Sequence, residues 1–196
     1  MCGVKKAFLA ITFATCACVS CASDSLAESD AASTAWYAGA AGGVMLPGNG
    51  NSLRRAAEIR LRGGCYFSEF FAFELEGSCV PFAASDHGGG TTLSGVAAQG
   101  LLHFSGWDAY DRLFGCERFD PFVTFGAMSR FAGRHVFADA SHRTAIGPVC
   151  GVGAFYHLTD SWSLRADATA QLCCDSPCGM LYGVSIGLQY GFGGGE

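Results

Sequence analysis

Charged side chains alternate with apolar ones along two neighbouring segments, residues 55–65 and 70–82. Residues two apart point to the same side of a β-strand, so the charges of each segment share one face. If the two segments form a hairpin centred near Ser68, Arg60 faces Glu76 and Arg62 faces Glu74. Guanidinium and carboxylate groups in that arrangement form bidentate ion pairs. The sequence therefore predicts charge pairing between adjacent strands.

A third segment, SWSLRADATAQL at 161–172, has one strictly polar face and one strictly apolar face. In a soluble protein the apolar face is buried, whereas in an outer-membrane barrel it meets lipid and the polar face lines the lumen. In the second case the charged residues fill a narrow lumen as mutually neutralising pairs. The lumen ion pairs are then expected among Arg60, Arg62, Glu74, Glu76, Arg165 and Asp167.

The same alternation recurs between turn-like residues and predicts eight strands. They cover residues 35–46, 55–65, 70–82, 93–105, 121–131, 145–157, 161–172 and 180–192. A tilted strand needs ~10 residues to cross a bilayer, whereas strands of soluble proteins usually have ~5–6. Aromatic residues also fall near the predicted strand ends, as an interfacial girdle requires: Trp36, Tyr156, Trp162, Tyr182, Tyr190 and Phe192.

These features predict an all-β fold, an eight-stranded antiparallel up-and-down transmembrane β-barrel. The alternative is a soluble sandwich or lipocalin-like barrel with the same rings in its core. With the N-terminus in the periplasm, the inner connections are 66–69, 106–120 and 158–160, and the outer ones are 47–54, 83–92, 132–144 and 173–179. The second inner connection is too long for a tight turn, so a helical turn is expected at 108–113.

The N-terminal segment indicates export. Lys5 and Lys6 precede an apolar stretch and small residues ending at Ala27, which predicts a secretory signal peptide over 1–27 and a barrel domain over 28–196. The alternative is a lipoprotein signal with Cys21 acylated. Charged residues make up 15% of the chain and the formal net charge is −5, so nucleic-acid binding has no support.

Of the eleven cysteines, four lie in the signal segment and seven in the exported part. An oxidising compartment favours disulfides over thiol chemistry. The expected pairs are Cys65 with Cys116, both on inner turns, and Cys174 with Cys178, which share an outer loop. Cys150 is expected to face lipid and to stay reduced. Cys174 and Cys178 do not make a metal motif by themselves, because no second cysteine pair and no histidine lies near them in the sequence. No metal or cofactor is therefore expected.

Three stretches have the pattern of small outer-membrane barrels: DPFVTFGAM at 120–128, GVGAFYHLTDSWSLRADA at 151–168 and YGVSIGLQYGF at 182–192. With them the chain resembles the OmpA-like and OmpW-like eight-stranded barrels of diderm bacteria. The resemblance implies the bacterial outer membrane as location, and outer-membrane lipid and the barrel-assembly machinery as partners. These families usually finish on an aromatic residue, whereas here four residues follow Phe192. The motifs specify architecture more than activity.

The first functional hypothesis is a non-enzymatic barrel with a polar-plugged lumen and surface loops that serve a structural or adhesive role. An eight-stranded barrel has an interior that side chains can fill, so general diffusion is not expected. A host or other extracellular ligand would contact loop residues Asp86, His87, Arg134, His135, Asp139, His142 and Arg143. The alternative implied by OmpW-like resemblance is a narrow channel for small hydrophobic molecules, which needs an open lumen.

A third hypothesis is an outer-membrane lipid-modifying enzyme. His103 and Ser105 share one face of the predicted strand 93–105, an arrangement loosely similar to that of a lipid-A deacylase. The predicted topology places both at the periplasmic end, away from outer-leaflet lipid, and assigns no acid to orient the histidine. We therefore expect both residues to face the lumen, and we expect no enzyme activity.

Overall fold

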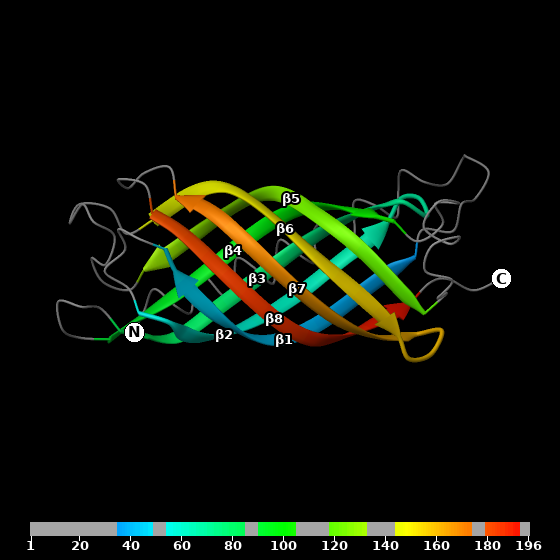
Figure 1. The fold of residues 1–196 in the computed structure, drawn as a ribbon, viewed down its shortest axis with the longest axis horizontal. Helices are drawn as coiled ribbons and strands as arrows, with labels where there is room; N and C mark the ends of the chain where they lie inside the picture. The colour runs from blue at the N-terminus through cyan, green and yellow to red at the C-terminus, as the bar shows by residue number, and fades with distance from the viewer. Residues whose placement is uncertain are drawn as a thin grey trace. The chain divides into compact units, whose positions relative to one another are not determined.

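A computed structural model describes residues 35–48, 54–84, 90–104, 118–132, 144–173 and 179–192, and the predicted signal peptide lies outside these ranges. The eight strands are β1 (Trp36–Pro47), β2 (Ala56–Tyr66), β3 (Phe71–Ala84), β4 (Gly90–His103), β5 (Phe119–Ala132), β6 (Thr144–His157), β7 (Trp162–Cys173) and β8 (Gly179–Phe192). Each pairs antiparallel with the next, and β8 pairs with β1 to close the barrel (Figure 1). The predicted eight-stranded antiparallel barrel is confirmed.

The apolar faces of the strands point outward. On the outer surface, Val152 is 59% exposed and Ile186 is 58% exposed, whereas the charged Arg60 is only 1% exposed. A water-soluble barrel would show the reverse arrangement, because apolar side chains leave water when they can be buried. A closed barrel also leaves no unpaired sheet edge, which hydrocarbon would not tolerate. Within the described ranges, no helix has the length and apolarity to cross a membrane.

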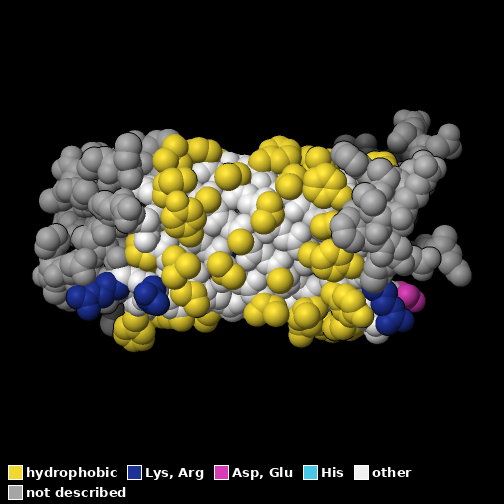
Figure 2. Space-filling view, viewed as in Figure 1, with side chains coloured by type: hydrophobic (Ala, Val, Ile, Leu, Met, Phe, Trp, Pro, Cys, Tyr) yellow, Lys and Arg dark blue, Asp and Glu magenta, His cyan; other side chains and the backbone are white. Residues whose placement is uncertain are grey.

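Larger hydrophobic side chains gather toward the two ends of the barrel, as Figure 2 shows. We call the end that carries the β2–β3 and β6–β7 turns the turn end, and the opposite end the loop end. At the turn end, the Trp162 and Tyr190 rings lie 5.0 Å apart and the Tyr190 and Phe192 rings 6.3 Å apart, measured between centroids. All three side chains are partly exposed and lie on the outer surface. This is the placement of an interfacial aromatic girdle.

The β2–β3 register differs from the predicted one. Arg62 is opposite Glu76 and Arg60 is opposite Ser78, so the predicted pairs Arg60 with Glu76 and Arg62 with Glu74 are wrong as directly opposed residues. Both pairs are present as diagonal ion pairs, with Arg60 Nη1 3.8 Å from Glu76 Oε2 and Arg62 Nε 3.9 Å from Glu74 Oε1. The turn is centred on Glu69, one residue later than expected. The Ser68 hydroxyl stabilises this turn by accepting hydrogen bonds from the backbone N–H groups of Phe70 and Phe71, at 3.3 and 3.1 Å.

Two strand ends beside the long inner connection also differ from the prediction. β4 ends at His103, and β5 begins at Phe119. Asp120 is therefore part of a strand and points into the lumen, although the sequence interpretation placed it in the connection 106–120. The helical turn expected at 108–113 lies outside the described residues.

Candidate functional site

The lumen holds the densest group of charged side chains in the described part of the barrel. Inward positions of β2, β3 and β7 supply it, since side chains of one parity on each strand share the inner face. The structure places all six predicted lumen residues there, each 7% exposed or less: Arg60, Arg62, Glu74, Glu76, Arg165 and Asp167. Their contacts extend across the lumen as well as between neighbouring strands.

Arg60 and Arg62 of β2 share the carboxylate of Asp167 on β7. Arg60 Nη1 lies 3.3 Å from Asp167 Oδ1, and Arg62 Nη1 lies 2.8 Å from Asp167 Oδ2. On the adjacent strand, Arg62 Nε donates a hydrogen bond of 2.8 Å to Glu76 Oε2. β7 is not a neighbour of β2 in the sheet, so these contacts cross the lumen and link opposite walls of the barrel.

Arg165 of β7 also makes a contact across the lumen, here from a β7 arginine to a β3 carboxylate. Its guanidinium donates two hydrogen bonds to Glu74 of β3, with Nη2 to Oε1 at 3.2 Å. Its Nε also lies 3.3 Å from Asp167 Oδ2. The same guanidinium packs over the rings of Phe122 and Phe155, 4.7 and 5.2 Å from their centroids. Arg165 thus joins the ion pairs to the aromatic residues at the turn end.

Two further members were missing from the predicted set. Glu58 accepts hydrogen bonds from Arg60 at 3.0 and 2.8 Å and forms an ion pair with Arg130 of β5 at 2.9 Å. Glu58 has the same parity as Arg60, and Arg130 lies at an inward position of the alternating strand β5, so the alternation that located the other charges also locates these. With them the cluster contains four arginines and four carboxylates, and its formal charge is zero. We call these eight side chains the lumen network.

Glycines on the inner wall make room for the arginines. A Cβ atom built at Gly183 of β8 would overlap the guanidinium of Arg60. A Cβ atom at Gly187 would overlap the carbonyl oxygen of Ala40 and the side chain of Ala41 on β1. The large inward residues of β2 and β7 therefore lie near glycines of β8, which is how a narrow barrel interior is filled without strain.

Apolar layers enclose the lumen network at both ends. At the loop end, the buried cluster consists of Met45, Ala56, Val80, Ala83, Leu93, Ala132, Ala145 and Leu181. At the turn end, it consists of Tyr37, Ala72, Leu101, Phe122 and Phe155, with Tyr66 packed against it. The Tyr37 hydroxyl also donates a hydrogen bond of 3.0 Å to Glu74, which ties this cluster to the network.

His103 lies in the turn-end layer and is paired with an acid. Its Nδ1 is 2.6 Å from Oδ2 of Asp120, and its side chain is 1% exposed. The Tyr66, Phe122 and Phe155 rings surround it, with centroids 5.3 to 5.9 Å away. The expectation that no acid orients His103 is therefore wrong, because Asp120 belongs to β5. The expectation that His103 faces the lumen agrees with its position.

Several predicted site residues lie outside the described residues. They are Asp86, His87, Ser105, Cys116, Arg134, His135, Asp139, His142, Arg143, Cys174 and Cys178. Cys65 is buried on β2, and Cys150 is exposed on the outer surface of β6, where it was expected to face lipid. In the described part of the chain, no group of three or more His, Cys, Asp or Glu side chains could hold a metal ion.

No protein-family model and no curated protein sequence matches the chain. Solved structures do match it. Neisserial surface protein A aligns with 81% of this chain and 99% of its own, at 16% identity and a TM-score of 0.59. Ail, the attachment invasion locus protein of Yersinia pestis, aligns with 82% of this chain and 99% of its own, at 10% identity and a TM-score of 0.57.

The chain has the fold of an eight-stranded outer-membrane β-barrel. A major outer membrane protein from Thermus thermophilus shares it, at 15% identity and a TM-score of 0.50 over 81% of this chain and 99% of its own. The outward apolar belt requires a bilayer, and the bilayer in which such barrels lie is the bacterial outer membrane. In such barrels short turns face the periplasm, and two of the three connections at the turn end of this barrel, 67–70 and 158–161, are short.

Proposed function

We propose that this chain is a non-enzymatic outer-membrane barrel with a closed lumen, and that it acts through its surface loops. The observation that carries the proposal is the lumen network, buried between two apolar layers. An ion passing through would have to displace paired charges from a site with little access to water, which is costly. Because the interior is occupied in this way, the surfaces left for a function are the loops and the lipid-facing wall.

The enzyme hypothesis has no support from the surroundings of His103. A general base must reach the proton that it removes in a bound substrate. Here three rings cover the imidazole, and Asp120 occupies its Nδ1. This arrangement favours a packing role for His103 and Asp120, which fill the turn end of the lumen where β4 ends and β5 begins.

For the loop ligand, we propose a sulfated or similarly anionic polysaccharide. The connection 133–143 contains Arg134, His135, His142 and Arg143 but only one acidic residue, Asp139. Arginine binds sulfate and phosphate groups in a bidentate manner. The structure of Ail, which shares this fold, was determined in complex with the heparin analogue sucrose octasulfate. The proposal places the structural and adhesive role of the barrel in this loop.

The test is binding of the purified, folded barrel to immobilised heparin, compared with an unsulfated polysaccharide. We expect binding that weakens as salt is raised, because the charges involved are exposed. The double variant Arg134→Gln/Arg143→Gln should bind at least about tenfold more weakly, since two charge-assisted contacts are lost. Arg118→Gln, at the opposite end of the barrel, is the matched control. Equal binding by the double variant and the parent would refute the loop assignment.

A further inference from the structure

The buried charges in the described part of the chain balance only if one histidine is charged. The lumen network is neutral, and the other buried carboxylate that the structure describes is Asp120 of β5, which is 5% exposed. The same buried set contains one histidine, His103 of β4, which is 1% exposed. A neutral imidazole would leave a net negative charge on this set, in a poorly hydrated interior where charges are costly unless they are paired. An imidazolium would bring the formal charge of the set to zero.

The contact between His103 and Asp120 has the geometry of a charge-assisted hydrogen bond. His103 Nδ1 lies 2.6 Å from Asp120 Oδ2, whereas a neutral N–H···O hydrogen bond is usually about 2.9–3.0 Å long. The rings of Tyr66, Phe122 and Phe155 lie 5.3 to 5.9 Å from the imidazole, between centroids, which is close enough for a cation–π interaction. His103 Nε2 is buried and accepts no hydrogen bond from a described residue, so no described donor holds this nitrogen in its unprotonated form. These surroundings favour the doubly protonated ring.

The other titratable and charged groups near His103 lie farther from its nitrogens. Among the described residues, Asp120 is the ionisable group within hydrogen-bond distance of the imidazole. Tyr66 of β2 packs on the ring, but tyrosine stays neutral over the pH range in which histidine titrates. Arg165 of β7 lies on two of the three rings and is bound by carboxylates of the lumen network. The further groups described at the turn end are Tyr37, which packs on Tyr66, His157, whose Nδ1 contacts the Ser163 hydroxyl, and the exposed Glu69, Arg118 and Asp160.

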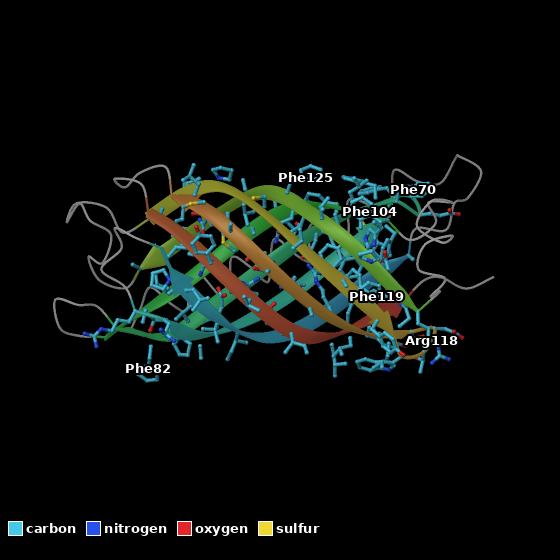
Figure 3. The ribbon with its side chains drawn as sticks, in the orientation of Figure 1. Phe70, Phe82, Phe104, Arg118, Phe119 and Phe125 are labelled. Carbon is cyan, nitrogen blue, oxygen red and sulfur yellow. The ribbon has the colours of Figure 1, made fainter. Side chains whose placement is uncertain are left out.

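The pair lies where β4 and β5 separate. Short turns join β2 to β3 and β6 to β7 at this end of the barrel, whereas the longer connection 104–118 joins β4 to β5. The backbone N–H of Phe104 donates a hydrogen bond of 3.0 Å to the carbonyl oxygen of Pro121. Figure 3 shows Phe104 and Phe119, the sequence neighbours of the pair, at the turn end. An ionic contact at this position holds together the last inward residues of two strands that no short turn connects.

We propose that His103 is doubly protonated in the folded barrel and forms with Asp120 a pH-sensitive ion pair that holds β4 to β5 at the turn end. The ion pair exists only in the folded state, so the folded state binds this proton more strongly than the unfolded state does. Its contribution to stability is therefore present at acidic pH and is lost as the pH rises and the imidazole gives up its second proton. The proposal concerns the turn end and does not depend on the polysaccharide ligand.

Nuclear magnetic resonance of the refolded barrel, with ¹⁵N-labelled histidine side chains, tests the protonation state directly. The signals of His103 are identified by their loss in the variant His103→Gln. We expect both ring nitrogens of His103 to carry a proton at about pH 6, near the value at which an unperturbed histidine is half charged. A ring with one unprotonated nitrogen at that pH would overturn the proposal.

The pH dependence of unfolding tests the role of the pair. Urea unfolding in lipid vesicles is measured at about pH 5.5 and about pH 8.5, a range that spans the titration of histidine. Between these values, the equilibrium constant for folding of the parent should fall at least about tenfold more than that of His103→Gln, which corresponds to one unit of difference in proton affinity. Asp120→Asn should lose the same pH dependence, because it removes the negative charge and keeps the shape of the side chain.

The variant His157→Gln is the matched control, since His157 also lies at the turn end and contacts a hydroxyl instead of a carboxylate. It should keep the pH dependence of the parent. Equal pH dependence of the parent and His103→Gln overturns the proposal, as does a pH dependence that disappears in His157→Gln instead. A gel comparison of boiled and unboiled samples verifies that each variant is folded. If His103→Gln or Asp120→Asn does not fold, the protonation state of the parent, measured by magnetic resonance, still decides.

Discussion

The arginines of the lumen network are held by contacts from opposite walls of the barrel. Arg165 is bound by Glu74 of β3 and Asp167 of its own strand, and it packs on two rings. A buried ion pair often adds little stability compared with a well-packed apolar pair, but removal of one partner leaves an uncompensated charge. At the residue scale, the pairing of each charge therefore matters more than the number of charges.

The variant Arg165→Met tests this statement. It leaves Glu74 without its bidentate partner, so we expect a loss of about 3–5 kcal/mol in the free energy of unfolding. The double variant Arg165→Met/Glu74→Met removes both charges and should recover most of the loss. Urea unfolding in lipid vesicles, followed by the fluorescence of the three tryptophans, measures both. A single variant as stable as the parent would show that the pair is not buried.

The strands and their faces could be predicted because a strand has a strict two-residue period, and both faces of segments such as 161–172 are uniform. The β2–β3 register was missed by one residue in the turn centre, since the backbone hydrogen bonds to the Ser68 hydroxyl set it. Asp120 was missed because the start of β5 was placed after it. Contacts across the lumen, such as Arg62 with Asp167, depend on barrel closure and have no local signal in the sequence.

At the scale of the element, the glycines on the inner face of β8 leave room for Arg60 and for the neighbouring strand β1. The substitution Gly187→Val would place side-chain atoms against the backbone of β1, which cannot move without breaking the sheet. We expect it to lower the free energy of unfolding by about 1–3 kcal/mol, the usual cost of overpacking. Gly42→Val on the outer surface of β1, where a Cβ meets no atom within 4 Å, is the control and should change stability by less than about 0.5 kcal/mol.

The temperature at which the compact band of an unboiled sample disappears from a gel compares these two variants directly. Gly187→Val should lose that band at a lower temperature than the parent, and Gly42→Val at the same temperature. Equal behaviour of the two glycine variants would mean that the inner face of β8 has free space beside it. That result would favour an open lumen.

At the scale of the whole molecule, the barrel separates an outer surface suited to lipid from an interior that is charged but neutral overall. Apolar layers at the loop end and the turn end enclose the lumen network. The interior thus holds opposite walls together, and the strand ends carry the connections between strands. This division of roles is the basis for assigning function to the outer surface.

Conductance across a planar lipid bilayer tests the closed lumen most directly. The refolded protein is inserted after gel mobility has verified that it is folded, and current is recorded under applied voltage. We predict no steady stepwise conductance from the parent barrel, because the lumen network and both apolar layers block the passage of ions. Reproducible stepwise conductance from the folded parent would contradict the closed lumen and favour the narrow channel.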